Sequence, residues 1–141
     1  MKKLFIGLVL ALAPLAVFAQ TVLGKWKLST GTAIVEVYQS GGVYNGRIVW
    51  LKNPTQPDGT PAVDSKNPNA NLRSRKLMGL NMLSGLKASN GEYSGGKIYD
   101  PGNGKTYNCS MKVDGKVLKV RGSLDKKGLI GRTMDWFRVE E

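Results

Sequence analysis

The chain has 141 residues, with 21 lysines and arginines against 10 aspartates and glutamates, so its formal net charge is +11. It contains no histidine and one cysteine, which excludes Ser-His and Cys-His catalytic arrangements, the usual zinc sites and an internal disulfide. The length suits one domain built around one hydrophobic core and is too short for two.

Residues 1–19 have the three-part pattern of a secretory signal peptide. Lys2 and Lys3 give a positive start, an apolar stretch covers residues 4–17, and Val17 and Ala19 are small residues at the positions that a signal peptidase recognises. The apolar stretch is shorter than the roughly 20 residues of a membrane-spanning helix. We therefore expect cleavage after Ala19, a single mature domain at 20–141 with no transmembrane span, and a periplasmic or secreted location.

The charge of the mature domain bears on its partners. Cleavage takes two lysines away and leaves 19 basic residues against 10 acidic ones, a net charge of +9. An exported protein seldom meets nucleic acid, so we expect none. Anionic envelope lipid, lipopolysaccharide or a carboxylate ligand fits the charge better, and a merely solvated basic surface is the alternative. The sequence does not predict the oligomeric state.

Short strands separated by glycine turns fill the mature part of the chain. The expected strands are residues 24–28, 33–38, 43–51, 77–83, 92–100, 105–113, 116–123 and 131–139. Glycine pairs and Asn-Gly or Asp-Gly turns join several of them, most clearly Asp114-Gly115. No segment has the periodicity of an amphipathic helix.

One long connection interrupts this rhythm at residues 52–76. It is rich in proline, asparagine and serine, and one short helical turn is expected after Pro68. Loops of this length are usually functional or disordered. Its end carries Arg73, Arg75 and Lys76, which fits either a solvated loop or a lid over a barrel mouth.

Eight strands in succession predict an all-β fold, an eight-stranded antiparallel up-and-down barrel. Closure removes the unpaired edges, and the interior of such a barrel has room for side chains or one small ligand. Alternation places Tyr107, Cys109 and Met111 on the inner face, so Cys109 is expected to be a buried thiol. In the last strand Trp136 and Arg138 share one face, so a polar group enters the interior or both faces are covered.

The candidate ligand-binding residues are aromatic side chains and one arginine, because small-molecule pockets are mostly apolar with a few placed polar groups. They are Tyr38, Arg47, Trp50, Tyr99, Tyr107 and Trp136. The alternative for each aromatic residue is an ordinary core position, which is the commoner place for such side chains. If Ile48 and Trp50 face inward, Arg47 points outward, and the reverse register is also open.

Catalytic signals are weak. A carboxylate pair among Glu36, Asp100 and Asp135 stays open, because all three lie in or at the ends of expected strands. The segment from Gly102 to Thr106 is not a phosphate loop, since its first glycine is missing and a strand follows it. We assign no catalytic residue, metal ligand or cofactor, and leave enzymatic activity undecided.

Gly24-Lys25-Trp26 at the first strand, with an arginine near the last strand, resembles the signature of the lipocalin and calycin barrels. The resemblance implies that Trp26 closes the base of the barrel, and that Arg132 or Arg138 packs over its ring as a cation–π pair.

A second resemblance spans nearly all of the mature chain. It rests on residues 35–39, 46–51, 72–75, 96–101, 104–107, 118–122 and 131–133 with Trp136, in that order. These segments resemble the family of exported bacterial proteins called DUF2147, which implies export and a lipocalin-like barrel and brings no catalytic residue. The family pattern has a cysteine pair where this chain has Ser40 and Asn45, and a proline where it has Lys76.

We therefore expect a periplasmic protein that binds a small apolar or acidic molecule, such as a fatty acid or lipid fragment, inside the barrel. The alternative is an envelope interaction module whose core is filled and whose basic surface binds anionic lipid, lipopolysaccharide or a protein. A hydrolase or isomerase would need a buried carboxylate pair. The sequence leaves open whether the barrel is hollow.

Overall fold

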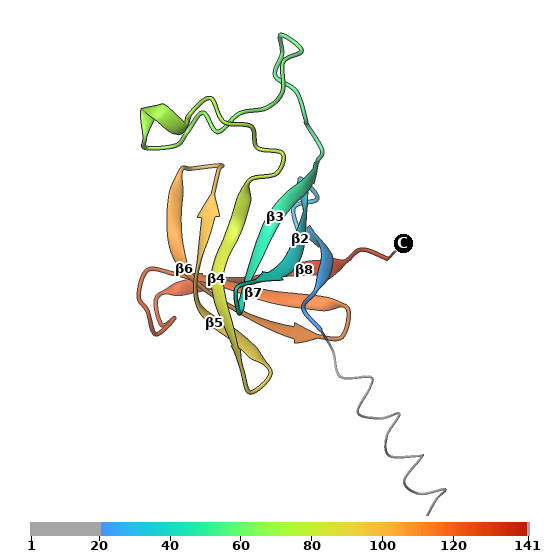
Figure 1. Ribbon diagram of the computed structural model, residues 1–141, viewed down its shortest axis with the longest axis vertical. Helices are drawn as coiled ribbons and strands as arrows, with labels where there is room; N and C mark the ends of the chain where they lie inside the picture. Colours follow the sequence, from blue (N-terminus) through green and yellow to red (C-terminus); the bar gives the residue numbers. More distant parts are fainter. Residues whose placement is uncertain (1–20, 141) are drawn as a thin grey trace, which may run out of the picture.

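Eight antiparallel strands close into a barrel in the computed structural model, which describes residues 21–140 (Figure 1). They are β1 (Gly24–Leu28), β2 (Ala33–Ser40), β3 (Val43–Leu51), β4 (Asn81–Ser89), β5 (Glu92–Asp100), β6 (Lys105–Asp114), β7 (Val117–Ser123) and β8 (Gly131–Arg138). Each strand pairs with the next, and β8 pairs with β1. The predicted barrel is thereby confirmed, whereas the predicted signal peptide lies outside the described residues.

Trp26 closes one end of the barrel. Its ring is fully buried, and its Nε1 donates a hydrogen bond of 2.8 Å to the carbonyl of Val22. The guanidinium of Arg138 lies over the ring, 4.0 Å from Cζ to the ring centroid, and donates to the carbonyls of Thr21 and Leu23. The cation–π contact and these hydrogen bonds fasten the entering chain to the last strand.

Gly24 makes room for this arrangement. Its φ of +120° suits glycine, and a Cβ atom there would lie 3.0 Å from Nη1 of Arg138. The Gly-x-Trp pattern thus has a local physical cause. Arg132, the other candidate for this contact, sits six residues earlier on β8, toward the opposite end of the barrel.

Inward-facing side chains fill the half of the barrel next to Trp26. Strand pairing aligns Met111 with Val120, Val113 with Leu118, and Leu118 with Trp136 across neighbouring strands. The fully or nearly fully buried members of this core include Val22, Val35, Val37, Leu83, Leu86, Met111, Leu118 and Val120. Cys109 is also buried, in agreement with the predicted alternation.

The fourth strand is displaced from its predicted position. It was expected at residues 77–83 but begins at Asn81 and continues to Ser89, because residues 77–80 form a turn in which Leu80 N bonds to the carbonyl of Leu77. Within β4, Gly85 adopts a φ of +73°, and its N–H donates a hydrogen bond to Oδ1 of Asn45. The strand passes through this irregularity and keeps its partner β3.

The long β3–β4 connection is ordered in the structure and lies at the open end of the barrel (Figure 1). Isolated bridges join Thr55 to Pro61 and Val63 to Lys76. A 3₁₀ helix, η1 (Ala70–Leu72), follows Pro68 as predicted, and the side chain of Asn69 caps it.

A buried carboxylate holds this connection to the barrel wall. Asp64 is 1% exposed and accepts hydrogen bonds from Tyr99 Oη (2.7 Å), Asn67 Nδ2 (2.9 Å) and Arg75 Nε (2.9 Å). Burial alone would raise the pKa of Asp64, but the three hydrogen bonds and the charge of Arg75 outweigh it and hold the pKa below 3.8. Because Tyr99 belongs to β5, the cluster ties the connection to a strand.

We predict that Asp64→Ala lowers the free energy of unfolding by about 1–3 kcal/mol, because Tyr99, Asn67 and Arg75 lose their shared acceptor. The difference between wild type and variant should shrink as the pH falls from about 5 through the folded-state pKa, since a carboxylate with a lowered pKa stabilises the fold only while ionised. Denaturant titrations at several pH values measure both quantities.

Asp58→Ala is the matched control in the same connection. Asp58 is exposed and its hydrogen bonds go only to Thr60, so the variant should change stability by less than about 0.5 kcal/mol. An Asp64→Ala protein as stable as wild type at pH 7 would show that the cluster does not hold the connection.

Candidate functional site

The half of the barrel opposite Trp26 is hollow. A cavity of about 740 Å³, which we call the barrel cavity, opens where the β1–β2, β5–β6 and β7–β8 connections meet. Its volume lies within the range of about 300–1,000 Å³ that is typical of small-molecule sites. The site therefore lies in the position that an eight-stranded barrel offers to one ligand.

The floor and walls of the barrel cavity are apolar. Trp136 forms its deepest part and is 1% exposed, with Met134 beside it on the same face of β8. Ile98 and Met82 line the wall from β5 and β4, and Leu28 lines it from β1. Such a surface favours an apolar ligand, because each buried methylene contributes about 0.8 kcal/mol.

Gly122 leaves space inside this wall. It lies on the inner face of β7, opposite Cys109 and Arg132 on the neighbouring strands. A Cβ atom at Gly122 would meet Ile98 Cγ2 at 3.5 Å and Tyr107 Cβ at 3.7 Å, which are ordinary contacts. A larger side chain here would therefore extend into the cavity.

Two cations stand at the rim of the barrel cavity. Arg132 and Lys105 both line it, and neither side chain forms an ion pair within residues 21–140. Asp100 also lines the rim, but its Oδ1 accepts a hydrogen bond from Gly102 N within the β5–β6 turn. The rim is thus positively charged and could meet an acidic group.

Two of the six predicted ligand-binding residues line the barrel cavity. Trp136 lies at its floor, and Tyr107 lies on its wall with its hydroxyl accepting a hydrogen bond from Asn103 Nδ2 at 3.1 Å. Strand alternation predicts the inner face for Tyr107, whereas it leaves the inner face of the last strand, which carries Trp136, open.

Tyr38 and Arg47 do not line it, which corrects the expectation for these two residues. Arg47 lies over the Tyr38 ring at 4.6 Å and pairs with Glu36 at 2.9 Å. Tyr38 Oη donates to Oδ1 of Asn81 on β4. These contacts form a polar row across the outer wall, because the three residues alternate with the buried Val35, Val37, Gly46 and Ile48.

Trp50 and Tyr99 also lie outside the barrel cavity, and each has a specific reason. A bulge shifts the β2–β3 register, so that Val35 pairs with Ile48 but Ile34 pairs with Trp50. Trp50 therefore turns outward, where Nζ of Lys27 lies 5.1 Å from its ring. Tyr99 follows the inward-facing Ile98 and points to Asp64 in the long connection.

Arg132 has a different place from the one predicted, since it lines the cavity rim instead of closing the barrel. The inner face of β8 carries Arg132, Met134, Trp136 and Arg138, so an arginine stands at each end of an apolar row. The alternation of residues along the last strand could have placed Arg132 on the same face as Trp136 from the sequence alone. Lys105 and Gly122 were missed, because a terminal lysine and a strand glycine look like ordinary turn and spacer residues.

The three carboxylates considered for catalysis are held apart. Glu36 pairs with Arg47 on β2–β3, and Asp135 pairs with Lys119 at 2.8 Å on β7–β8. Asp100 lies at the end of β5, which neighbours neither β2 nor β8. In the described part of the chain, no three His, Cys, Asp or Glu side chains group together in a way that could hold a metal ion.

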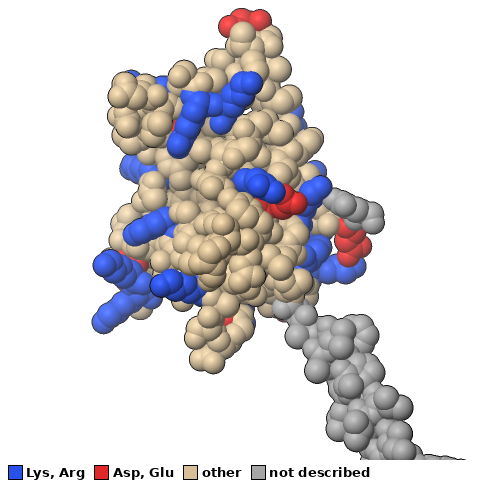
Figure 2. Space-filling view, in the orientation of Figure 1, with Lys and Arg blue, Asp and Glu red and all other residues tan. Residues whose placement is uncertain are grey.

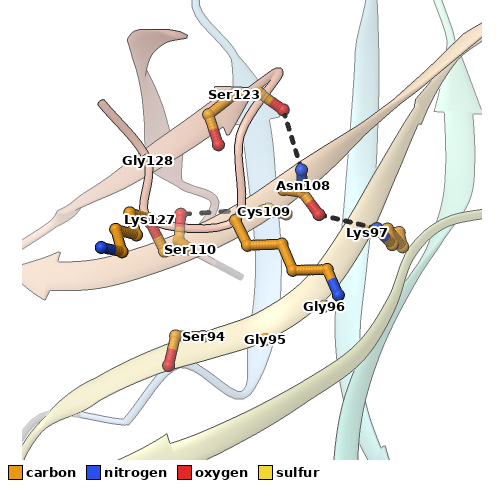
Figure 3. Close-up of a pocket in the computed structure, with 11 residues that line it drawn as sticks. Ser94, Gly95, Gly96, Lys97, Asn108, Cys109, Ser110, Ser123, Lys127 and Gly128 are labelled. Carbon is orange, nitrogen blue, oxygen red and sulfur yellow. Dashed lines mark hydrogen bonds between the residues drawn. The ribbon is translucent and has the colours of Figure 1, made fainter. Parts of the chain in front are cut away.

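A second hollow lies against the barrel wall, over β5 and β6 and under residues 126–128. This outer groove has a volume of about 430 Å³, and Figure 3 shows Lys127 and Lys97 on its two sides. Cys109 borders it but is only 4% exposed, and burial raises the pKa of its thiol to about 12. Cys109 is therefore a packed apolar residue and not a reactive nucleophile.

The comparisons with known proteins agree with this architecture. A family model described as "Uncharacterized protein conserved in bacteria (DUF2147)" matches residues 24–138. Among solved structures, the chain is similar to protein HP1028 from the human pathogen Helicobacter pylori, which is described as belonging to the lipocalin family. The TM-score is 0.75 and the identity 26%, and the match covers 86% of this chain and 84% of the other. A search of curated proteins finds no match.

We predict that Cys109 resists thiol reagents in the folded protein. With its pKa raised from 9.0 to about 12, the thiolate fraction at pH 8 is very small, so Ellman's reagent should react at least about a hundredfold more slowly than with the chain in guanidinium. Absorbance at 412 nm follows the reaction. Fast, complete labelling in native buffer would contradict the burial of this thiol.

Proposed function

The chain belongs to the DUF2147 family, and on this premise we propose that it binds a small apolar molecule with an acidic group in the barrel cavity. The observation that carries the proposal is the barrel cavity itself, about 740 Å³ in volume, with Trp136 at its apolar floor and Arg132 and Lys105 at its rim. Apolar atoms would enter first, and the acidic group would stay at the mouth.

The division of the cavity into floor and rim supports this class of ligand. An alkyl chain gains about 0.8 kcal/mol for each methylene that leaves water for the floor. A carboxylate or phosphate at the rim would accept charge-assisted hydrogen bonds from Arg132, whose planar guanidinium suits such groups. The same cations would disfavour a positively charged ligand.

The structural relative supports the proposal through its description. Protein HP1028 is described as a lipocalin, and eight-stranded barrels of that shape have an interior that can hold one small molecule. The hollow half of the present barrel is the feature that a filled-core interaction module would lack.

A periplasmic or secreted location is part of the proposal. It rests on the signal-peptide pattern of residues 1–19. In the periplasm or outside the cell, a protein that binds apolar molecules would carry lipid-like compounds through an aqueous space.

We predict that the purified protein takes up cis-parinaric acid, a fluorescent fatty acid, and that Gly122→Leu weakens this uptake at least about tenfold. The leucine side chain would occupy the space beside Ile98 and Tyr107 that the ligand needs. Fluorescence titration measures the dissociation constant. Gly122→Ala adds only a Cβ atom in ordinary contact and should bind nearly as wild type does.

Arg132→Gln tests the acidic group separately. It should weaken binding of the free acid about fivefold to tenfold and leave binding of the methyl ester unchanged, because only the carboxylate uses the charge. Arg47→Gln, on the outer wall, is the matched control and should affect neither ligand. No uptake by wild type, or undiminished uptake by Gly122→Leu, would refute the proposal.

We also predict that the native host secretes a chain that starts at Gln20. Intact mass spectrometry of the periplasmic and extracellular fractions should give the mass of residues 20–141. The uncut mass in the cytoplasmic fraction alone would refute export without bearing on the barrel cavity.

A further inference from the structure

Three aliphatic side chains stand exposed on the connection between β7 and β8, which we call the β7–β8 loop (residues 124–130). Leu124, Leu129 and Ile130 are 71%, 77% and 63% exposed, and no other large apolar side chain within residues 21–140 exceeds 47%. Several exposed aliphatic side chains on one loop are typical of a surface that meets another apolar phase.

The loop holds these side chains outward by its own hydrogen bonds. Leu124 N donates to the carbonyl of Ile130 at 2.8 Å, which closes the base of the loop. The carboxylate of Asp125 accepts from Ile130 N at 2.7 Å and from Leu129 N at 3.0 Å. The exposure is therefore fixed by a bonded turn and is not the fraying of a loose segment.

Two lysines lie between Leu124 and Leu129 in the sequence of the β7–β8 loop. Lys126 and Lys127 belong to the same loop, and together with Lys97 they line the outer groove. The lining of this groove contains no acidic side chain, and the backbone of Gly95 and Gly96 forms part of it. Figure 2 shows lysine and arginine side chains protruding on the side of the molecule where Figure 1 places this loop.

We propose that the β7–β8 loop docks the barrel onto an anionic lipid bilayer. Leu124, Leu129 and Ile130 would enter the boundary between headgroups and acyl chains, while the lysines of the outer groove meet lipid phosphates. Interfacial binding combines buried apolar area with attraction to anionic lipid in this way. One convex loop is too small for a standard protein interface of roughly 800 Å² per partner, whereas a bilayer accommodates single side chains.

Docking would orient the barrel cavity toward the membrane. Leu124 and Ile130 also line the cavity mouth, next to Arg132. A docked loop therefore places the mouth at the bilayer surface. The inference goes beyond ligand binding and does not require it, because Lys126, Lys127 and Leu129 are not part of the cavity lining.

Co-sedimentation of the purified protein with vesicles tests the proposal. The protein should bind vesicles of phosphatidylglycerol and phosphatidylethanolamine at least about tenfold more tightly than vesicles of phosphatidylcholine, and the difference should shrink as salt rises from about 0.05 to 0.5 M. Lys126→Gln with Lys127→Gln should weaken binding about 25-fold, at about fivefold per lysine. Leu129→Ser with Ile130→Ser should weaken it at least about tenfold.

Matched variants near the closed end of the barrel serve as controls. Lys87→Gln with Lys112→Gln removes the same charge from the outer wall, and Phe137→Ser removes an exposed apolar side chain from β8. Both should bind anionic vesicles nearly as wild type does. Gly122→Leu should also bind them normally, so a failure of ligand uptake and a failure of docking give different results.

A tryptophan at position 129 reports insertion directly. The emission of Leu129→Trp should shift to the blue on anionic vesicles and be quenched by brominated acyl chains, whereas Phe137→Trp should show neither change. Equal binding to anionic and zwitterionic vesicles, loop variants that behave as the controls do, or release of the protein by millimolar glycerol phosphate would each overturn the proposal.

Discussion

The pairing of β8 with β1 gives every strand two hydrogen-bonded neighbours and fixes the circumference of the barrel. An interior of this width holds about one layer of side chains from each wall. Large side chains around Trp26 therefore fill one half of the barrel interior. In the other half, the wall carries Gly122 and residues near the turns, and a cavity remains. The packed half and the cavity thus coincide with large and small side chains along the barrel wall.

The inner face of β8 connects the two halves. Arg138 lies over Trp26 at the closed end, Trp136 separates the packed core from the cavity, and Arg132 stands at the mouth. The two arginines differ in their contacts. Arg138 donates hydrogen bonds to backbone carbonyls, whereas Arg132 has no ion-pair partner among residues 21–140. Identical residue types on one face thus lie at both ends of the barrel, one closing it and the other placed to meet a ligand in the proposed function.

Two carboxylates give the connections at the open end a defined shape. Asp64 gathers Tyr99, Asn67 and Arg75 beneath the β3–β4 connection, and Asp125 accepts backbone hydrogen bonds across the β7–β8 loop. In both cases hydrogen bonds lower the pKa of the carboxyl group, so each is ionised at neutral pH. The β7–β8 loop contributes Leu124 and Ile130 to the cavity mouth, whereas the cavity lining includes no residue of the β3–β4 connection.

The sequence by itself determined the strand count, the antiparallel order and the inward position of Cys109, because these depend on local alternation and turn chemistry. The Gly-x-Trp base followed from the resemblance to the lipocalin and calycin barrels. Alternation also placed Tyr107 on the inner face, but it left open which face of the last strand, and so which direction of Trp136, points inward. The sequence did not determine the outward direction of Trp50, which results from a single bulge that reverses the faces of β3 after Ile48. It also did not determine the hydrogen bond between Tyr99 and Asp64, which are 35 residues apart. Nor did it decide that the barrel is hollow, since the free space at Gly122 depends on side chains from two other strands, Ile98 on β5 and Tyr107 on β6. Such features arise where distant segments meet, and only the tertiary structure brings those segments together.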